Sequence, residues 1–143
     1  MAKITKHHLE IENEINYDLI GLCSHVGDYR LVWNINETLD INLEKASDLF
    51  VINSKKGAVV SQHPYYMMHH EDERWDLYLI KNKNEGKFLI PEKQQIDYFL
   101  FVCNNYTINI EKWVEELRKI NSVIAAYSFD PENLLSTEQI IFE

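Results

Sequence analysis

The histidine-rich segment from His63 to Glu73 contains the residue types that could bind a metal ion. Imidazole and carboxylate groups are ligands for zinc, nickel or manganese, and this segment combines three histidines with three acidic residues. Adjacent residues of a strand point to opposite faces, so His69 and His70 do not easily share one ion. The candidate ligands are therefore His63, His69 and Glu71. An acidic hairpin tip with solvated histidines is the simpler interpretation, and we assign no metal or other cofactor.

A second pair of residues, Glu92 and Asp97, could act as a general acid and base. A structural role is favoured, because Glu92 follows Pro91 and can hold a turn, while Asp97 can accept hydrogen bonds from loop amides. No histidine, lysine or serine lies at a spacing that indicates a nucleophile and its base. Arg30 could interact with Glu92 or Asp97 if its helix lies near them. The sequence thus assigns no catalytic residue.

The two cysteines, Cys23 and Cys103, lie far apart, each in an apolar run. Neither belongs to a motif that lowers a thiol pKa, such as Cys-x-x-Cys, so both are interpreted as core thiols. The four glycines form no Gly-rich phosphate loop. With no apolar secretory signal near the start, we expect a reduced, cytoplasmic protein with free thiols.

Composition excludes several classes of protein. The 143 residues carry 14 Lys and Arg against 23 Asp and Glu, a formal net charge of -9. Because nucleic-acid binding depends on neutralising phosphates, we expect no direct binding of DNA or RNA. No apolar run approaches the roughly 20 residues of a membrane span. We interpret residues 1–143 as a single α+β domain, with a loose N-terminal end at 1–8 and a C-terminal tail, 130–143, that packs on the domain.

The elements that must position these residues follow from hydrophobic periodicity. Strands are expected at 17–23, 49–52, 75–80, 96–103 and 123–129, and an extended segment at 58–68 is interrupted by Pro64. Helices are expected at 28–38 and, after an Asn109 cap, at 110–120. This order predicts a mostly antiparallel sheet of about five to six strands with two main helices packed on one face, a ferredoxin-like variant.

A compact polar motif, Ile90-Pro91-Glu92-Lys93-Gln94-Gln95-Ile96-Asp97-Tyr98, precedes the most apolar predicted strand. Pro91 fixes its own φ and favours an extended Ile90. The motif resembles the signature of the IPExxxVDY family of small bacterial proteins known from Bacteroidetes, with Ile96 in place of Val. The resemblance extends to Asp28-Tyr29-Arg30-Leu31, Asn36, Ala126-Tyr127 and Asp130-Pro131-Glu132. It implies a compact α+β domain and a bacterial cytoplasmic context, and it brings no catalytic assignment.

Two functional hypotheses lead from the sequence, and a metal-dependent enzyme at the His63 to Glu73 segment is a third possibility. The first is a non-enzymatic interaction or adaptor protein that binds another protein or a second copy of itself as a homodimer through a sheet surface or edge. The second is a regulatory module similar to an ACT domain, which senses a small molecule through the loop residues Asn104, Asn105 and Thr107. The motif itself is interpreted as a structural hinge that delivers the central strand.

Overall fold

The computed structural model describes residues 15–142, so the predicted loose end at 1–8 lies outside the described residues. Two α-helices, α2 (Asp28–Leu39) and α3 (Ile110–Arg118), occur in this range. The strands are β1 (Tyr17–Ser24), β2 (Glu44–Lys45), β3 (Phe50–Asn53), β4 (Val59–His63), β5 (Tyr65–His69), β6 (Asp76–Lys81), β7 (Lys83–Asn84), β8 (Lys87–Phe88), β9 (Tyr98–Cys103) and β10 (Val123–Phe129). Three short 3₁₀ helices complete the chain, namely η1 (Pro91–Lys93), η2 (Pro131–Asn133) and η3 (Leu135–Gln139).

The main sheet has six strands in the order β10-β1-β9-β6-β5-β2, and every neighbouring pair is antiparallel. Because β9 and β10 are both antiparallel to β1, they run parallel to each other with β1 between them. The same reasoning makes β1 and β6 parallel on either side of β9. The predicted α+β class and mostly antiparallel sheet are confirmed, while the ferredoxin-like detail stays a prediction.

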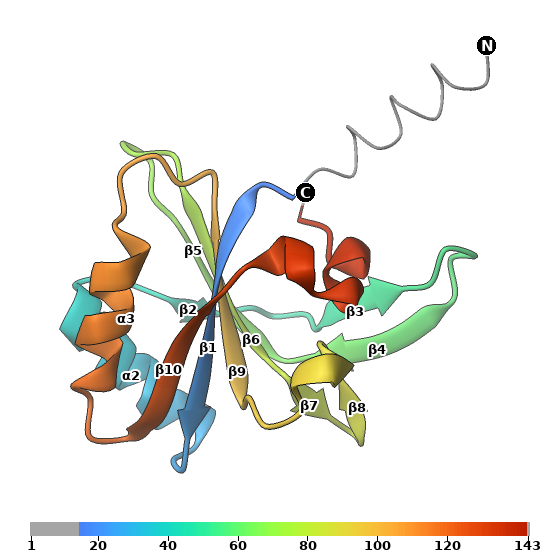
Figure 1. Cartoon of the computed structure of the whole chain (residues 1–143), viewed down its shortest axis with the longest axis horizontal. Coiled ribbons are helices and arrows are strands. Elements are labelled where there is room, and N and C mark those ends of the chain that lie inside the picture. Colours follow the sequence, from blue (N-terminus) through green and yellow to red (C-terminus); the bar gives the residue numbers. More distant parts are fainter. Residues whose placement is uncertain (1–14, 143) are drawn as a thin grey trace.

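The central strand β9 is buried along its whole length, since each of its six residues is at most 7% exposed. Its side chains alternate between two hydrophobic clusters. Tyr98, Leu100 and Val102 belong to the cluster that contains the buried faces of α2 and α3. Phe99, Phe101 and Cys103 belong to the opposite cluster. Both helices therefore cover one face of the sheet, as Figure 1 shows.

The second face of the sheet is covered without an α-helix. The β3–β4 hairpin contributes Ile52, the segment before and after η1 contributes Ile90 and Ile96, and the C-terminal tail contributes Leu134 and Ile140. In Figure 1 the tail, drawn in red, lies between β1 and the base of the β3–β4 hairpin. Segments far apart in the sequence thus meet over this face.

Both helices begin near their predicted residues. Asn109 caps α3, because its side chain accepts a hydrogen bond from the Lys112 N–H, which satisfies one of the free amides of the first turn. The apolar stripe of α3 buries Val114 and Leu117. No helix within residues 15–142 is long and apolar enough to cross a membrane.

Two segments differ in detail from expectation. Residues 58–68 form two strands, since Pro64 separates β4, which pairs with β3, from β5, which pairs with β6. Proline cannot donate a ladder hydrogen bond, and here it marks the passage of the chain from one sheet to another. The charged and polar run 81–85 has no apolar periodicity that would predict a strand, yet it contains the end of β6 and the short strand β7, with Asn82 fully buried between them.

Candidate functional site

The motif forms a stiff turn that is held from inside by Asn82, a residue with no solvent exposure. The Asn82 amide donates to the carbonyl oxygens of Lys93 at 2.9 Å and Ile96 at 2.8 Å. Its side-chain oxygen accepts from the Ile90 N–H at 3.0 Å. One side chain therefore bonds to main-chain groups before, within and after η1, and two of them, the Ile90 N–H and the Ile96 carbonyl, lie in buried bonds.

Glu92 connects the motif to the C-terminal tail. Its carboxylate accepts hydrogen bonds from the Ser136 N–H at 2.8 Å and the Ser136 hydroxyl at 2.6 Å. Partial burial alone would raise the pKa of Glu92. The hydrogen bonds from Ser136 and from the main chain of Glu92 and Leu135 outweigh it and lower the pKa. The ionised Glu92 carboxylate thus holds η3 in place through Ser136.

Asp97 connects the motif to β1. Its carboxylate accepts a hydrogen bond from the Ser24 N–H at 2.9 Å, and its main chain bonds to Leu22 and Asn82. The next residue, Tyr98, is buried, and desolvation, followed by the charges of Asp28 and Asp97, raises its pKa to about 12. Glu92 and Asp97 therefore bind different parts of the chain and do not form an acid–base pair.

A groove of about 870 Å³ lies between β3 and the tail. One wall is the consecutive stretch around β3, from Leu49 to Val51 and from Asn53 to Lys55. The other wall is the tail that Glu92 clamps, with Leu135, Glu138, Gln139, Ile141 and Phe142. The motif thus positions one wall of this groove through the Glu92–Ser136 contact.

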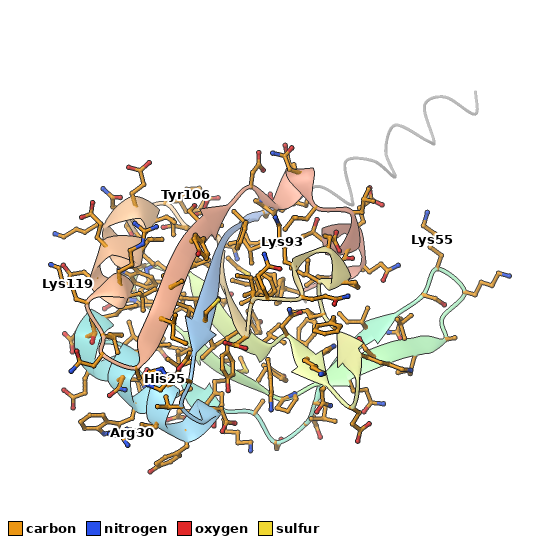
Figure 2. The ribbon with its side chains drawn as sticks, turned by 60° about the horizontal axis from the view of Figure 1, so that its bottom comes forward. His25, Arg30, Lys55, Lys93, Tyr106 and Lys119 are labelled. Atoms are coloured by element: carbon orange, nitrogen blue, oxygen red, sulfur yellow. The ribbon has the colours of Figure 1, made fainter. Side chains whose placement is uncertain are left out.

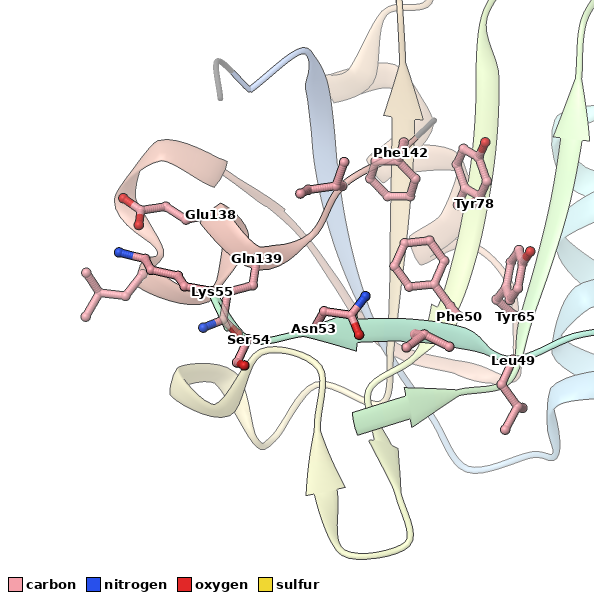
Figure 3. Close-up of a pocket in the computed structure, with 13 residues that line it drawn as sticks. Leu49, Phe50, Asn53, Ser54, Lys55, Tyr65, Tyr78, Glu138, Gln139 and Phe142 are labelled. Carbon is pink, nitrogen blue, oxygen red and sulfur yellow. The ribbon is translucent and has the colours of Figure 1, made fainter. Parts of the chain in front are cut away.

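The groove, which we call the β3–tail groove, has an aromatic half and a polar half (Figure 3). Phe50, Tyr65, Tyr78 and Phe142 gather in the aromatic half, where the Tyr78 and Phe142 ring centroids lie 4.4 Å apart. Burial, followed by the charge of Asp76, raises the pKa of Tyr78, so its hydroxyl stays neutral at pH 7. Ser54, Lys55, Glu138 and Gln139 line the polar half.

Exposed apolar side chains converge on this groove. Leu49, Val51, Leu135 and Ile141 are all at least 42% exposed, and all four line it. Scattered surface hydrophobics need no explanation, whereas a contiguous apolar surface rimmed by polar groups is typical of a binding site. The β3–tail groove is therefore the candidate functional site.

The structure does not bring the candidate metal ligands together. His63 is buried, Glu71 is exposed, and His69 bonds to Asp76 through an Nδ1–Oδ1 contact of 2.6 Å. In residues 15–142 no group of three or more His, Cys, Asp or Glu side chains is placed to hold a metal ion. The segment instead forms the β5–β6 turn, in which His70 stacks on Trp75.

His63 makes a contact that the sequence did not indicate. Its Nε2 lies 2.8 Å from the Ser61 hydroxyl, and both side chains are buried. Nδ1 has no hydrogen-bond partner among the described residues. Desolvation by burial lowers the pKa of His63. A serine and a histidine at this distance resemble a nucleophile and its base, but solvent and substrate have no access to the hydroxyl.

Arg30 does not meet the motif. It is exposed on α2 and makes no hydrogen bond or ion pair with Glu92 or Asp97. Figure 2 shows Arg30 at one edge of the molecule, well separated from Lys93 of the motif. The interaction considered from the sequence is therefore absent.

The loop proposed as a small-molecule site, with Asn104, Asn105 and Thr107, is held by its own hydrogen bonds. The Asn105 amide donates to Asp18 and to the Ile108 carbonyl, and its oxygen accepts from the main-chain N–H groups of Thr107 and Ile108. Asn104 adopts a left-handed backbone with φ of 57°. Both polar groups of the Asn105 side chain are thus used in holding the loop.

Both thiols are free, and neither is activated. Burial raises the pKa of Cys103 to about 12, with a further contribution from Asp76. The Cys23 thiol donates to the Gln95 carbonyl at 3.3 Å, and burial, followed by Asp97, raises its pKa. Since the thiolate is the nucleophile, these geometries favour the structural interpretation of both cysteines.

No protein-family model, no curated protein and no solved structure matches this chain. The resemblance of the motif to the IPExxxVDY signature therefore stays a prediction. Two features of the site were not predicted from the sequence. Asn82 lies in a polar run without any signal of burial, and the two walls of the groove are distant in sequence. The continuous apolar run of residues 49–52 was the one available signal.

Proposed function

We propose that this protein is a non-enzymatic protein-interaction module that binds its partner in the β3–tail groove. The observation that carries the proposal is the convergence of exposed Leu49, Val51, Leu135 and Ile141 around an aromatic floor. Bulky apolar anchors in a pocket with a polar rim are the usual energetic centre of protein interfaces. The free thiols of Cys23 and Cys103 support a reducing, cytoplasmic setting for this activity.

The side chains of the groove favour binding over catalysis. Its polar lining consists of Asn53, Ser54, Lys55, Glu138, Gln139 and the two tyrosines. No histidine or cysteine lines it, and the Ser54 hydroxyl accepts a hydrogen bond from the Ala58 N–H in its own turn. A nucleophile needs an adjacent base that a third group orients, and this lining provides no such set.

A displayed library of random dodecapeptides tests the proposal. We expect selection on the immobilised protein to enrich peptides that Leu135→Glu weakens at least tenfold. Tyr106→Glu is the matched control, because Tyr106 is 89% exposed, similar to 86% for Leu135, and lies far from the groove residue Lys55 (Figure 2). Failure to enrich any peptide, or equal loss in the two variants, would contradict the proposal.

A small-molecule sensor is the second candidate, and the volume of the groove favours it. About 870 Å³ lies within the range of roughly 300–1,000 Å³ typical of small-molecule sites. A thermal-shift screen with amino acids and nucleotides discriminates between the two. Stabilisation by one such compound that Leu135→Glu removes would support the sensor, whereas an unchanged melting temperature across the panel would dispose of it.

A further inference from the structure

The main chain of Val51 faces away from β4, as the hydrogen bond made by its partner residue Gln62 indicates. Val51 lies opposite Gln62 in the antiparallel β3–β4 pair. The Gln62 carbonyl accepts a bond of 2.7 Å from the side chain of Asn84 on β7, a strand that contacts β4. In an antiparallel pair, opposite residues either both bond across the pair or both point away from it. The N–H and C=O of Val51 therefore point out of the other edge of β3.

The β3–tail groove runs along this outer edge. Successive strand residues point to opposite faces, yet Leu49, Phe50 and Val51 all line the groove and no residue of β4 does. A hollow lined by consecutive residues lies beside the edge of a strand rather than over one face. Among the described residues, β4 is the only strand that pairs with β3.

The two edges of the main sheet are less open than β3. At β10, which forms one edge, the Arg118 Nε donates to the Ala126 carbonyl at 2.9 Å, and the register shifts between Cys23 and Ser24 of its partner strand. At the other edge, β2 is only two residues long and both are charged. Side-chain capping, bulges, short length and charge are the usual protection against added strands. β3 contains only Phe, Val, Ile and Asn.

We infer that the partner binds as an extended peptide that adds to the outer edge of β3 and bonds to the N–H and C=O of Val51. This inference rests on the proposed function and specifies its binding mode. An added strand alternates its side chains between two faces, so a bulky apolar residue of the peptide packs in the aromatic half of the groove, against the Phe50 and Phe142 rings, which contact each other with centroids 5.3 Å apart. Main-chain bonds provide affinity, and this pocket provides specificity.

The charge at the far end of β3 defines the remaining chemistry of the peptide. Lys55 lines the groove on the β3 side and Lys56 follows it at the hairpin turn, whereas Glu138 lies on the tail side. One end of a strand added to β3 therefore lies beside these lysines. The peptide therefore carries an acidic residue next to Lys55, and its binding weakens with added salt.

Two variants at one position test the binding mode with an enriched dodecapeptide as the probe. Val51→Pro removes only the outward N–H, which takes no part in the β3–β4 ladder, and proline is tolerated at such an edge. Val51→Ala trims the side chain and keeps the N–H. We expect Val51→Pro to bind the peptide at least tenfold more weakly than Val51→Ala, with equal thermal unfolding of the two variants. Methylation of single peptide amides should weaken binding only at every second position of the bound segment.

The outcomes separate this inference from the proposed function. Strand addition would be overturned if Leu135→Glu weakens peptide binding while Val51→Pro and methylation of every single amide leave it unchanged. The groove would then remain the binding site. A concentration-dependent dimer that Val51→Pro abolishes would assign the edge to a second copy and overturn a separate partner. Tenfold tighter peptide binding after deletion of residues 1–14 would assign the outer edge of β3 to this first segment of the chain and overturn a separate partner.

Discussion

Replacing Asn82 with alanine is the sharpest perturbation of the structural role given to the motif. The substitution removes three hydrogen bonds at 2.8 to 3.0 Å. It leaves the Ile90 N–H and the Ile96 carbonyl, both in buried bonds, without partners. The third partner, the Lys93 carbonyl, is only partly buried and keeps its hydrogen bond from the Ile96 N–H at 3.2 Å, so its loss is smaller.

The size of the effect follows from these three groups. An unsatisfied buried polar group costs about 1–3 kcal/mol, so two such groups and a partly solvated third reduce the free energy of unfolding by about 3 kcal/mol. For a chain of this length, 1 kcal/mol corresponds to roughly 3–5 °C in melting temperature. The variant should therefore melt roughly 10 °C below the parent.

Urea unfolding followed by tryptophan fluorescence measures the change, with calorimetry for the melting temperature. Asn84→Ala is the matched control, since Asn84 lies two residues away and its amide makes a single exposed hydrogen bond, worth about 1 kcal/mol or less. If Asn82→Ala unfolds at the same urea concentration as Asn84→Ala, Asn82 does not hold the turn and the structural reading of the motif fails.

Three further predictions concern charge and the sheet edge. Glu92→Gln should reduce the free energy of unfolding by about 1 kcal/mol at pH 7. Because the folded pKa of Glu92 lies below its ordinary 4.5, this difference in stability from the parent should disappear as pH falls through the folded pKa. A difference that does not depend on pH would refute the role of Glu92 in holding the tail. For buried His63 the folded pKa lies below the ordinary 6.5, so the unfolded chain takes up the proton first and the parent should lose stability as pH drops below about 6.5. In urea titrations, His63→Gln should reduce the dependence of the free energy of unfolding on pH in this range. An unchanged dependence would contradict the prediction. Arg118→Ala frees the outer carbonyl of Ala126 and should increase self-association in sedimentation velocity relative to Lys119→Ala, whereas equal behaviour would show that the edge needs no cap.

Local signals were sufficient to predict the main elements. The continuous apolar run of β9 predicts a strand buried on both faces, and the cap at Asn109 with its apolar stripe predicts α3. The predicted strand order along the chain also leads to a mostly antiparallel sheet. These features depend on residues close in sequence, which is why periodicity and capping chemistry reach them.

Other features depend on contacts that no local pattern specifies. The sequence predicts that Pro64 interrupts an extended segment, and only the three-dimensional structure shows that the chain passes there from one sheet to another. Asn82 lies among lysines and asparagines, and its burial follows from the unpaired main-chain groups of a turn that begins eight residues later. Residues of one polar type can be solvated or buried, and the sequence alone does not distinguish the two cases.

The groove illustrates the same limit for function. Its walls, the stretch around β3 and the C-terminal tail, become neighbours through the packing of the tail on the sheet and the Glu92–Ser136 contact. The sequence hypothesis of binding through a sheet edge was general, and it named no strand. The protected edges at β10 and β2 and the outward main chain of Val51 now direct that hypothesis to β3.

Amide hydrogen exchange at Val51, measured by nuclear magnetic resonance with Ile52 as internal reference, tests the central claim most directly. Ile52 pairs with Ser61, and since bonding alternates along the pair, its N–H is bonded to β4 and should exchange slowly throughout. Val51 should exchange rapidly in the free protein and become protected when an enriched peptide binds. Slow exchange at Val51 in the free protein, or rapid exchange that the peptide leaves unchanged, would contradict strand addition at β3.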